Sequence, residues 1–383
     1  MKSITVLPGK RKGSVLVPFS KSHLHRLLVA DFLAGGDRFR HALESCEDVD
    51  ATRRCLLALA ENKGAAPVLD CGESGSTLRF MLPVAMAKAG KAIFTACGRL
   101  PQRPLQPFLE LLSTNGVGVR SGSFPLQLEG RLKPGLYEVP GDISSQIITG
   151  LLFALPILDG DSVIRLKSPL QSRGYVDMTL SVLAKYGIAI KETPDGFSVR
   201  GGQKYAENRD LEAERDWSSA AFWIAMNELG SQIGIDGMDS RSCQPDRAMT
   251  WLSRQEGGAI DVSQCPDLFP VLAALAAVRG AQTLFTGVRR LRMKESDRLA
   301  AMADVLRCLD VSVRMAEDSF VVEGRGAPLD GGVAVNPRND HRIAMAAAVL
   351  ATACRKPLEI LDPDCTAKSY PDFFSQLERL EFL

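Results

Sequence analysis

Basic and hydroxyl side chains stand at the starts of several predicted helices. Lys21 and Ser22 open an apolar helical pattern, and Arg79 lies in the first turn of a later one. Backbone N–H groups and the positive end of the helix dipole favour an anion at such a place. Similar residues recur near other helix starts: Arg26, Arg103, Ser144, Ser145, Gln146, Ser172, Lys294, Arg298, Arg342 and Lys368. Each alone is typical of a helix cap or a solvated surface. Together they predict a site for ligands with several phosphate and carboxylate groups.

Two carboxylates stand among these cations. Asp267 opens an apolar helical run, where an N-cap is the ordinary role. Glu295 lies between Lys294 and Arg298, where an ion pair within a helix is ordinary. Lys294 and Arg298 are four residues apart, so on a helix they share a face. Two acids in a cationic site suit proton transfer at two centres.

The elements that would position these residues repeat along the chain. Mostly apolar helices are predicted near Ser20, Ser74, Ser144, Ser218, Asp267 and Asp340, and amphipathic helices near Asp48, Pro104, Tyr175, Asp246, Glu295 and Pro371. Alternating apolar residues around short polar turns predict β-hairpins at 116–130, 187–201 and 310–324. Six units of strand, buried helix, strand, amphipathic helix and hairpin therefore fit between residues 20 and 383.

Chain length and the repeats together favour two domains. The chain has 383 residues, which is long for a single core. Six units divide into three plus three, and the polar stretch 201–214 is the best linker candidate. Two short strands are expected at 3–7 and 13–17. A small-molecule site is expected in the cleft between the domains.

Composition narrows the class of protein. The formal net charge of +1 argues against a nucleic-acid-binding surface. The nine cysteines form no CxxC pair and no zinc spacing, and no HExxH motif occurs, so we expect reduced thiols in a cytoplasmic protein. The N-terminus is too polar for a signal peptide, and no apolar run approaches membrane-spanning length.

Five motifs, in this order along the chain, carry a resemblance to a known family. They are Gly-Glu-Ser-Gly-Ser-Thr-Leu-Arg (72–79), Ser-Ser-Gln (144–146), Arg-Met-Lys-Glu-Ser-Asp-Arg (292–298), Asp-His-Arg (340–342) and Lys-Ser-Tyr-Pro-Asp (368–372). The chain resembles, nearly end to end, the 5-enolpyruvylshikimate-3-phosphate (EPSP) synthases, which are enolpyruvyl transferases. The resemblance implies an α/β (α+β) fold of two similar domains, each of three βαβαββ units with buried helices, an inverse α/β barrel. It implies domains at 18–212 and at 1–17 plus 213–383, with an N-terminal hairpin in the second domain.

The implied reaction moves the enolpyruvyl group of phosphoenolpyruvate to the 5-hydroxyl of shikimate 3-phosphate and releases phosphate. This step of the shikimate pathway leads to chorismate and the aromatic amino acids. No metal or organic cofactor is implied, and we expect a cytoplasmic monomer that binds neither nucleic acid nor membrane. An open form is expected to close when both ligands bind.

The resemblance also implies a role for each site residue. The phosphate of shikimate 3-phosphate would be held by Ser144, Ser145 and Ser172, and its ring and carboxylate by Ser22 and Arg26. The phosphate of phosphoenolpyruvate would be bound at Gly75, Arg103, Gln146, Lys368 and Lys21, and its carboxylate by Arg298 and Arg342. Asp267 would accept the proton of the attacking hydroxyl, and Glu295 would protonate the methylene carbon and later remove a proton. Lys21 and Lys294 would assist proton transfer.

Four positions depart from the family pattern. Phe19 replaces the usual glycine, Glu73 stands where asparagine is frequent, and Arg173 with Gly174 stands where Lys-Pro is common. Arg290 falls near a substrate-facing asparagine of part of the family. Because Glu73 lies close to the expected anion pocket, we expect Arg79 or another cation to pair with it.

Two alternatives remain open at this point. The related transferase that acts on UDP-N-acetylglucosamine often uses a loop cysteine, and Cys97 falls in that region. A non-catalytic anion-binding relative is the other alternative, although Asp267, Glu295 and Lys21 are all present. If Asp267 is the proton acceptor, replacing it by alanine should reduce turnover far more than ligand binding.

Overall fold

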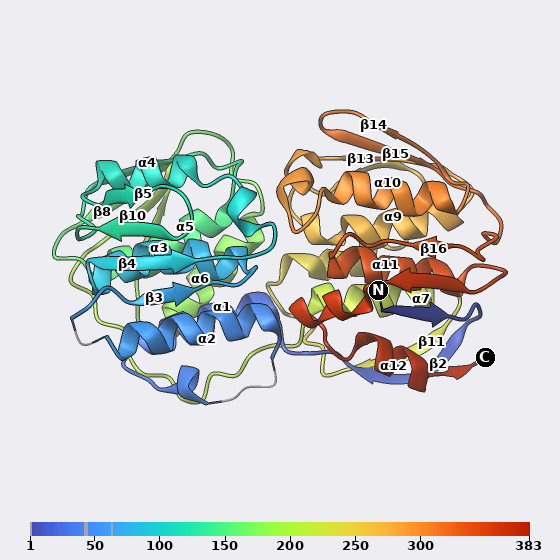
Figure 1. The fold of residues 1–383 in the computed structure, drawn as a ribbon, viewed down its shortest axis with the longest axis horizontal. Helices are drawn as coiled ribbons and strands as arrows, with labels where there is room; N and C mark the ends of the chain where they lie inside the picture. The colour runs from blue at the N-terminus through green and yellow to red at the C-terminus, as the bar shows by residue number, and fades with distance from the viewer. Residues whose placement is uncertain (1, 42–44, 63) are drawn as a thin grey trace. The chain divides into compact units, whose positions relative to one another are not determined.

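The chain folds into two compact units (Figure 1). The computed structural model describes residues 2–41, 45–62 and 64–383. Unit 1 joins Met1–Ser20 to Glu214–Leu383, and unit 2 is Lys21–Ala213. Residues 201–213, within the expected linker, contain no helix or strand. Both chain ends therefore belong to unit 1.

Two four-stranded sheets of unit 2 have the same strand arrangement. One has the order β3 (Val68–Asp70), β4 (Lys91–Thr95), β6 (Leu126–Glu129) and β5 (Gly118–Ser121). The other has the order β7 (Leu136–Val139), β8 (Ser162–Leu166), β10 (Gly196–Val199) and β9 (Ile190–Thr193). In each sheet the first two strands are parallel and the last two form an antiparallel hairpin. The hairpins predicted at 116–130 and 187–201 are confirmed.

The helices of unit 2 come from segments that are far apart in the sequence. They are α1 (Lys21–Leu33), α2 (Glu47–Ala60), α3 (Gly75–Lys88), α4 (Gln106–Thr114), α5 (Ser145–Ala154) and α6 (Arg173–Lys185). Nearly every residue of α3 and α5 is buried, as expected of helices that are apolar on all sides. A Cβ on Gly150 would lie 2.4 Å from the carbonyl oxygen of Arg79. Glycine therefore lets α5 approach the α3 backbone closely.

Unit 1 repeats the same arrangement once in full. Its four-stranded sheet has the order β12 (Gly258–Asp261), β13 (Gln282–Thr286), β15 (Ser319–Glu323) and β14 (Ser312–Met315). Strands β12 and β13 are parallel and β14–β15 is a hairpin, which confirms the prediction at 310–324. The helices of unit 1 are α7 (Trp217–Glu228), α8 (Met249–Leu252), α9 (Phe269–Val278), α10 (Arg298–Cys308), α11 (His341–Thr352) and α12 (Phe373–Arg379). Every residue of α11 is buried, and Phe269 of α9 packs edge-on against Phe285 and Phe320.

The chain termini complete the two remaining sheets of unit 1. One has the order β11 (Gln232–Asp236), β2 (Arg11–Leu16) and β18 (Glu381–Phe382), and the other β1 (Ser3–Val6), β17 (Leu358–Leu361) and β16 (Ala334–Val335). The expected N-terminal hairpin is therefore wrong, because β1 and β2 belong to different sheets. Gly9, at φ +118°, donates its N–H to the carbonyl of Thr352 at 3.1 Å. This bond holds the turn that connects β1 to β2 in the other sheet.

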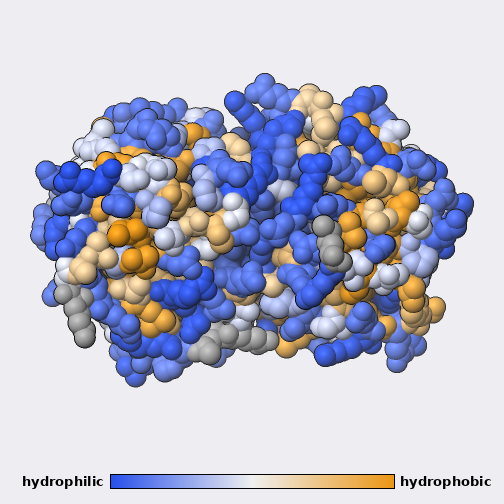
Figure 2. Space-filling view, in the orientation of Figure 1, coloured by the Kyte–Doolittle hydropathy of each residue, from blue (hydrophilic) through white to orange (hydrophobic). Residues whose placement is uncertain are grey.

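The visible surface of each unit is mostly hydrophilic, with hydrophobic residues in small separate areas (Figure 2). Among the described residues, no helix has the length and apolar character that crossing a membrane requires.

Candidate active site

Two guanidinium groups lie over the N-terminus of α3. Ser74 caps this helix by accepting the N–H of Thr77 at 3.2 Å. Gly75 is the first residue of the helix, and a Cβ there would lie 2.6 Å from Nη1 of Arg103 and 2.9 Å from Nη1 of Arg79. Positive charge and helix N–H groups thus meet at a position that has no side chain of its own.

The N-terminus of α5 joins this cluster through Gln146. Ser144 caps α5 by accepting the N–H of Gln146 at 3.3 Å. Nε2 of Gln146 donates to Oγ of Ser76 at 2.8 Å, and its Oε1 accepts from Nη1 of Arg79 at 3.4 Å. Arg79, predicted from the sequence as a cation at a helix start and as a partner for Glu73, is therefore part of the site.

Lys21 is held by a carboxylate from the next helix. Nζ of Lys21 lies 2.9 Å from Oδ2 of Asp48, and the two side chains are 13% and 11% exposed. Asp48 lies in the first turn of α2, where its charge also complements the helix dipole. The sequence marks Asp48 as a helix start but gives no sign of this pairing.

Arg26 connects α1 to α6. Its Nε donates to Oγ1 of Thr179 at 2.9 Å, and its Nη groups donate to the carbonyls of Ser22 and Tyr175 at 2.5 and 2.9 Å. The residue is buried, so these bonds fix the guanidinium firmly.

Ser172 adopts a left-handed conformation just before α6. Its φ is 56° and its ψ is 41°, a conformation that costs a residue other than glycine about 1–2 kcal/mol. The next residue, Arg173, donates from Nε to Asp177 at 2.5 Å and from Nη2 to Glu192 at 2.6 Å. These bonds tie the strained turn to α6 and β9.

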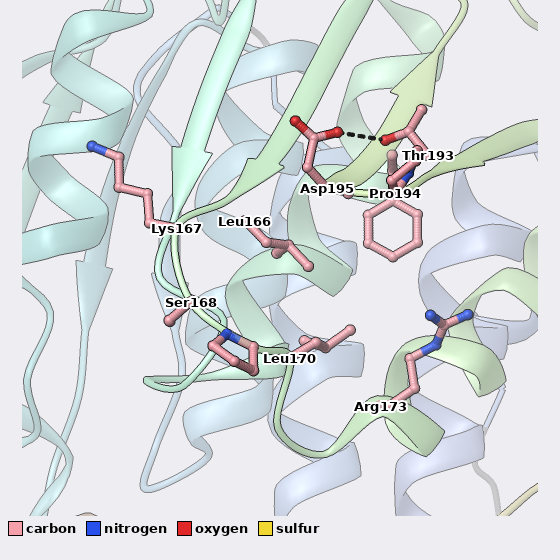
Figure 3. A pocket seen from close by; sticks show the side chains of 11 residues that line it. Leu166, Lys167, Ser168, Leu170, Arg173, Thr193, Pro194 and Asp195 are labelled. Carbon is pink, nitrogen blue, oxygen red and sulfur yellow. Dashed lines mark hydrogen bonds between the residues drawn. The ribbon is translucent and has the colours of Figure 1, made fainter.

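A pocket of about 460 Å³ lies beside this turn (Figure 3). Its lining includes Arg173 on one side and, on the other, Asp195, which accepts a hydrogen bond from the Thr193 hydroxyl at 3.1 Å. The lining contains none of the site residues predicted from the sequence. This pocket is therefore not part of the predicted anion-binding site.

In unit 1, Arg298 connects three carboxylates. Its Nε donates to Asp340 at 2.9 Å, its Nη1 to Asp267 at 2.7 Å and its Nη2 to Glu295 at 2.8 Å. The Arg298 side chain is only 1% exposed. Burial works against its charge, but the three carboxylates outweigh burial and raise the pKa of Arg298.

Asp267 is bound by cations on both oxygens. Oδ1 lies 2.7 Å from Arg298 and 3.6 Å from Nζ of Lys294, while Oδ2 accepts from Arg342 at 2.9 Å. Asp267 lies in a short 3-10 turn, Pro266–Leu268, and α9 begins after it without a side-chain cap. The N-cap role is therefore not the one this carboxylate plays.

Lys294 does not share a helix face with Arg298, so that prediction is wrong. Asp297 accepts the N–H groups of Leu299 and Ala300, each at 3.1 Å, and this cap starts α10 at Arg298. Lys294 has extended backbone, and Asp267 brings it close to Arg298 instead. Burial, opposed by the charge of Asp267, lowers the pKa of Lys294 to about 8.

A tight turn before α11 positions two more predicted cations. Arg338 and Asn339 have φ values of 54° and 57°. Nζ of Lys368 donates to the Asn339 carbonyl at 2.9 Å, and Asp340 caps α11 by accepting the N–H of Arg342 at 3.0 Å. Asp340 thus orients Arg342 and Arg298 together.

The family model described as EPSP synthase (3-phosphoshikimate 1-carboxyvinyltransferase) matches residues 7–252 and 226–377. The chain belongs to this family. A protein of Clostridium kluyveri named 3-phosphoshikimate 1-carboxyvinyltransferase is 38% identical, over 99% of this chain and 97% of its own length. A protein of the same name from Clostridium novyi is 35% identical, over 99% and 98% of the two chains.

Solved structures agree on the fold. The EPSP synthase of Acinetobacter baumannii matches with a TM-score of 0.79 at 23% identity, covering 100% of this chain and 99% of the other. The enolpyruvyl transferase NikO of Streptomyces tendae matches with a TM-score of 0.73 at 16% identity, covering 100% and 98%. The predicted two-domain enolpyruvyl transferase fold is confirmed.

The predicted site residues of this EPSP synthase family member fall into two clusters. Unit 2 contains Lys21, Ser22, Arg26, Gly75, Arg103, Ser144, Ser145, Gln146 and Ser172, and unit 1 contains Asp267, Lys294, Glu295, Arg298, Arg342 and Lys368. Sequence reasoning missed the counter-charges of Asp48 and Asp340. Within residues 2–41, 45–62 and 64–383, no three His, Cys, Asp or Glu side chains are grouped to hold a metal ion.

The structure shows the contacts of three residues that depart from the family pattern. Phe19 lies under the guanidinium of Arg215, whose Cζ is 4.0 Å from the ring centre. The Glu73 carboxylate lies against Gly98, at φ +57°, where a side chain would collide with it. Nη2 of Arg290 donates to the Ser263 carbonyl at 2.8 Å. That Arg79 or another cation pairs with Glu73 stays a prediction.

Proposed function

We propose that this chain transfers the enolpyruvyl group of phosphoenolpyruvate to the 5-hydroxyl of shikimate 3-phosphate and releases phosphate. One observation carries the proposal: Asp267 and Glu295 are gathered around Arg298, with Lys294 and Arg342 beside Asp267. Two acids are thereby placed among cations that would bind a carboxylate ligand. The names of the clostridial relatives support the same substrates.

These positions support the following proton transfers. Glu295 gives a proton to the methylene carbon of phosphoenolpyruvate, which leaves a positive charge on the neighbouring carbon. The 5-hydroxyl oxygen bonds to that carbon while its proton passes to Asp267, which gives a tetrahedral intermediate. Glu295 then removes a proton from the methyl group, the double bond reforms, and phosphate leaves with the electrons of the C–O bond. The leaving phosphate takes up the proton held by Asp267, so both acids return to their starting states.

Binding of the ligands would rest on charge and position. The phosphoenolpyruvate carboxylate would compete with Asp267 for Arg342 and Arg298, which frees Asp267 to act as a base. Arg103, Gln146, Lys21 and Lys368 would hold its phosphate beside Gly75. Ser144, Ser145 and Ser172 would hold the phosphate of shikimate 3-phosphate, with Ser22 and Arg26 at its ring.

A coupled phosphate-release assay tests the proposal. Turnover is expected with shikimate 3-phosphate plus phosphoenolpyruvate, and not with either alone. Turnover with UDP-N-acetylglucosamine in place of shikimate 3-phosphate would overturn it, as would ligand binding without turnover. The named relatives favour the shikimate substrate over the UDP-sugar.

Replacing Gly75 by alanine is expected to raise the KM for phosphoenolpyruvate about tenfold with little change in stability. The added Cβ would displace the guanidinium ends of Arg103 and Arg79, which are side-chain atoms and not backbone. Initial rates at varied phosphoenolpyruvate, with the melting temperature as the stability check, measure the effect. A loss of melting temperature that matches the loss of rate would contradict this account.

The pH dependence of kcat/KM is expected to show a basic limb near pH 8. Lys294 loses its charge there because its pKa is lowered to about 8, and an uncharged amine attracts an anionic substrate less. Lys294→Arg should move this limb upward, since arginine stays charged. Superimposable profiles would exclude Lys294 as the source.

The lowered pKa of Lys294 also affects the free energy of unfolding. This free energy rises with pH, whereas kcat/KM falls. The unfolded chain keeps the Lys294 proton up to the ordinary lysine pKa of 10.5, whereas the folded chain releases it near 8. Between these values the unfolded state binds more protons, so this group adds to the free energy of unfolding as the pH rises.

We also propose that the protein acts in the cytoplasm as a monomer. In the described structure none of the nine cysteines is assigned to a disulfide bond, which suits a reducing compartment. Light scattering of the purified protein, with and without both substrates, tests the oligomeric state.

A further inference from the structure

Two side-chain contacts one helical turn apart connect α1 to α2. Lys21 meets Asp48 at 2.9 Å, and His25 meets Thr52 at 2.8 Å between Nδ1 and Oγ1. Four residues separate the two members on each helix, so both contacts lie on the facing sides of α1 and α2. The first contact positions Lys21, a proposed catalytic residue. The proposed mechanism assigns no role to His25 or Thr52.

The second contact continues as a buried chain of hydroxyl groups into α3. Oγ1 of Thr52 lies 2.7 Å from Oγ1 of Thr77, which lies 2.8 Å from Oγ of Ser74. His25, Thr52, Thr77 and Ser74 have no exposed surface. A hydrogen bond lost at such a place is not replaced by water, so these bonds are strongly enforced. The chain ends at Ser74, the residue before Gly75.

The proton positions along the chain follow from the two acceptors of the Thr77 hydroxyl, one of which is Oγ of Ser74. Oγ1 of Thr77 also lies 3.2 Å from the backbone carbonyl of Asp48, which can only accept. When Thr77 donates to Ser74 or to this carbonyl, Thr52 donates to Thr77, and His25 donates from Nδ1 to Thr52. Nε2 of His25 is then an unprotonated nitrogen, which agrees with its having no hydrogen-bond partner. Burial, with the charges of Lys21 and Arg26, lowers the pKa of His25 and keeps the ring neutral.

We infer that His25, Thr52 and Thr77 are positioning residues that set Lys21 and the Ser74–Gly75 turn at a fixed separation. Asp48 receives the Thr77 hydroxyl on its carbonyl and Lys21 on its carboxylate, so one residue joins both ends of the network. Lys21 and Gly75 belong to the proposed phosphate pocket for phosphoenolpyruvate. The inference rests on that proposed function and adds how the pocket is held in shape.

Two groups proposed for shikimate 3-phosphate, Arg26 and Ser144, have hydrogen bonds outside this network. Arg26 is fixed by Thr179 and the Tyr175 carbonyl of α6, and Ser144 by its own helix. Loss of the hydroxyl chain should therefore weaken the use of one substrate much more than the other. A general loss of stability would not discriminate between the substrates.

The test uses Thr52→Val, which keeps the shape of the side chain and removes its hydroxyl. We expect the KM for phosphoenolpyruvate to rise about tenfold and the KM for shikimate 3-phosphate to change less than about twofold. Thr52→Ser should restore the value for phosphoenolpyruvate. Thr352→Val is the matched control, because Thr352 is a buried threonine whose hydroxyl donates to the Val349 carbonyl of its own helix at 2.7 Å.

His25→Asn provides a second variant should Thr52→Val fold poorly. Asparagine places an amide donor near the position of Nδ1, so the KM for phosphoenolpyruvate should stay within about threefold, whereas His25→Leu should raise it about tenfold. Equal rises of both KM values, or none in Thr52→Val and His25→Leu, would overturn the inference. A wild-type protein without turnover would instead overturn the proposed function.

Discussion

Asp267→Asn is expected to lower kcat by about 10²–10⁴-fold while the dissociation constants of both substrates change by less than about fivefold. The amide cannot accept the proton of the attacking hydroxyl. Its oxygen can still accept a hydrogen bond from Arg298 or Arg342, which now bind the carboxylate at 2.7 and 2.9 Å. Single-turnover phosphate release and calorimetric binding separate the two quantities.

Asparagine is a better test than alanine for a structural reason. Alanine would remove the counter-charge of two buried arginines at once, so it should also disturb binding of the phosphoenolpyruvate carboxylate. Asp31→Asn is a matched control, because Asp31 is a buried carboxylate that bonds to Arg38 outside both clusters. Turnover of Asp267→Asn within threefold of the wild type would remove Asp267 from the chemistry.

Arg298→Met is expected to lower the free energy of unfolding by about 3–5 kcal/mol. The change leaves Asp340, Asp267 and Glu295 without the guanidinium that all three contact at 2.7–2.9 Å. Asp340 is fully buried, so water cannot take the place of the lost charge there. Urea unfolding at pH 7.5 measures the loss.

Arg314→Met is the control for the loss of an arginine as such. Arg314 pairs with Glu323 at 2.8 Å, but its side chain is 68% exposed. Exposed pairs contribute at most about 1 kcal/mol, so its unfolding curve should stay near that of the wild type. Equal losses in the two variants would contradict the central role of Arg298 in unit 1.

The periodic part of the fold could be predicted from the sequence because its signals are local. The hairpins of β5–β6, β9–β10 and β14–β15 each lie within about fifteen residues, with alternating apolar positions around a polar turn. The pairing of the N-terminal strands could not be predicted in this way. β1 pairs with β17 more than 350 residues away, and no local pattern distinguishes that pairing from a hairpin with β2.

The site was predictable in its residue types and less so in its geometry. Cations and hydroxyls at helix starts identified Lys21, Ser144 and Arg342. The counter-charges Asp48 and Asp340 were missed because pairs across helices depend on packing, not on spacing along the chain. The prediction that Lys294 and Arg298 share a helix face was wrong, because Asp297 caps α10 and the helix begins at Arg298. An aspartate just before an apolar stripe is a known cap signal, so this boundary could have been predicted.

The placement of the chain ends has a consequence for synthesis on the ribosome. β1 and β2 emerge first, yet β17 and β18, their antiparallel partners, are translated last. Both sheets of the terminal segments must therefore stay incomplete until release, while Lys21–Ala213 contains both strands of every pairing in its own two sheets. The nascent protein thus carries open strand edges at its oldest end for most of translation, which is where a chaperone that binds extended chain would have the most time to act.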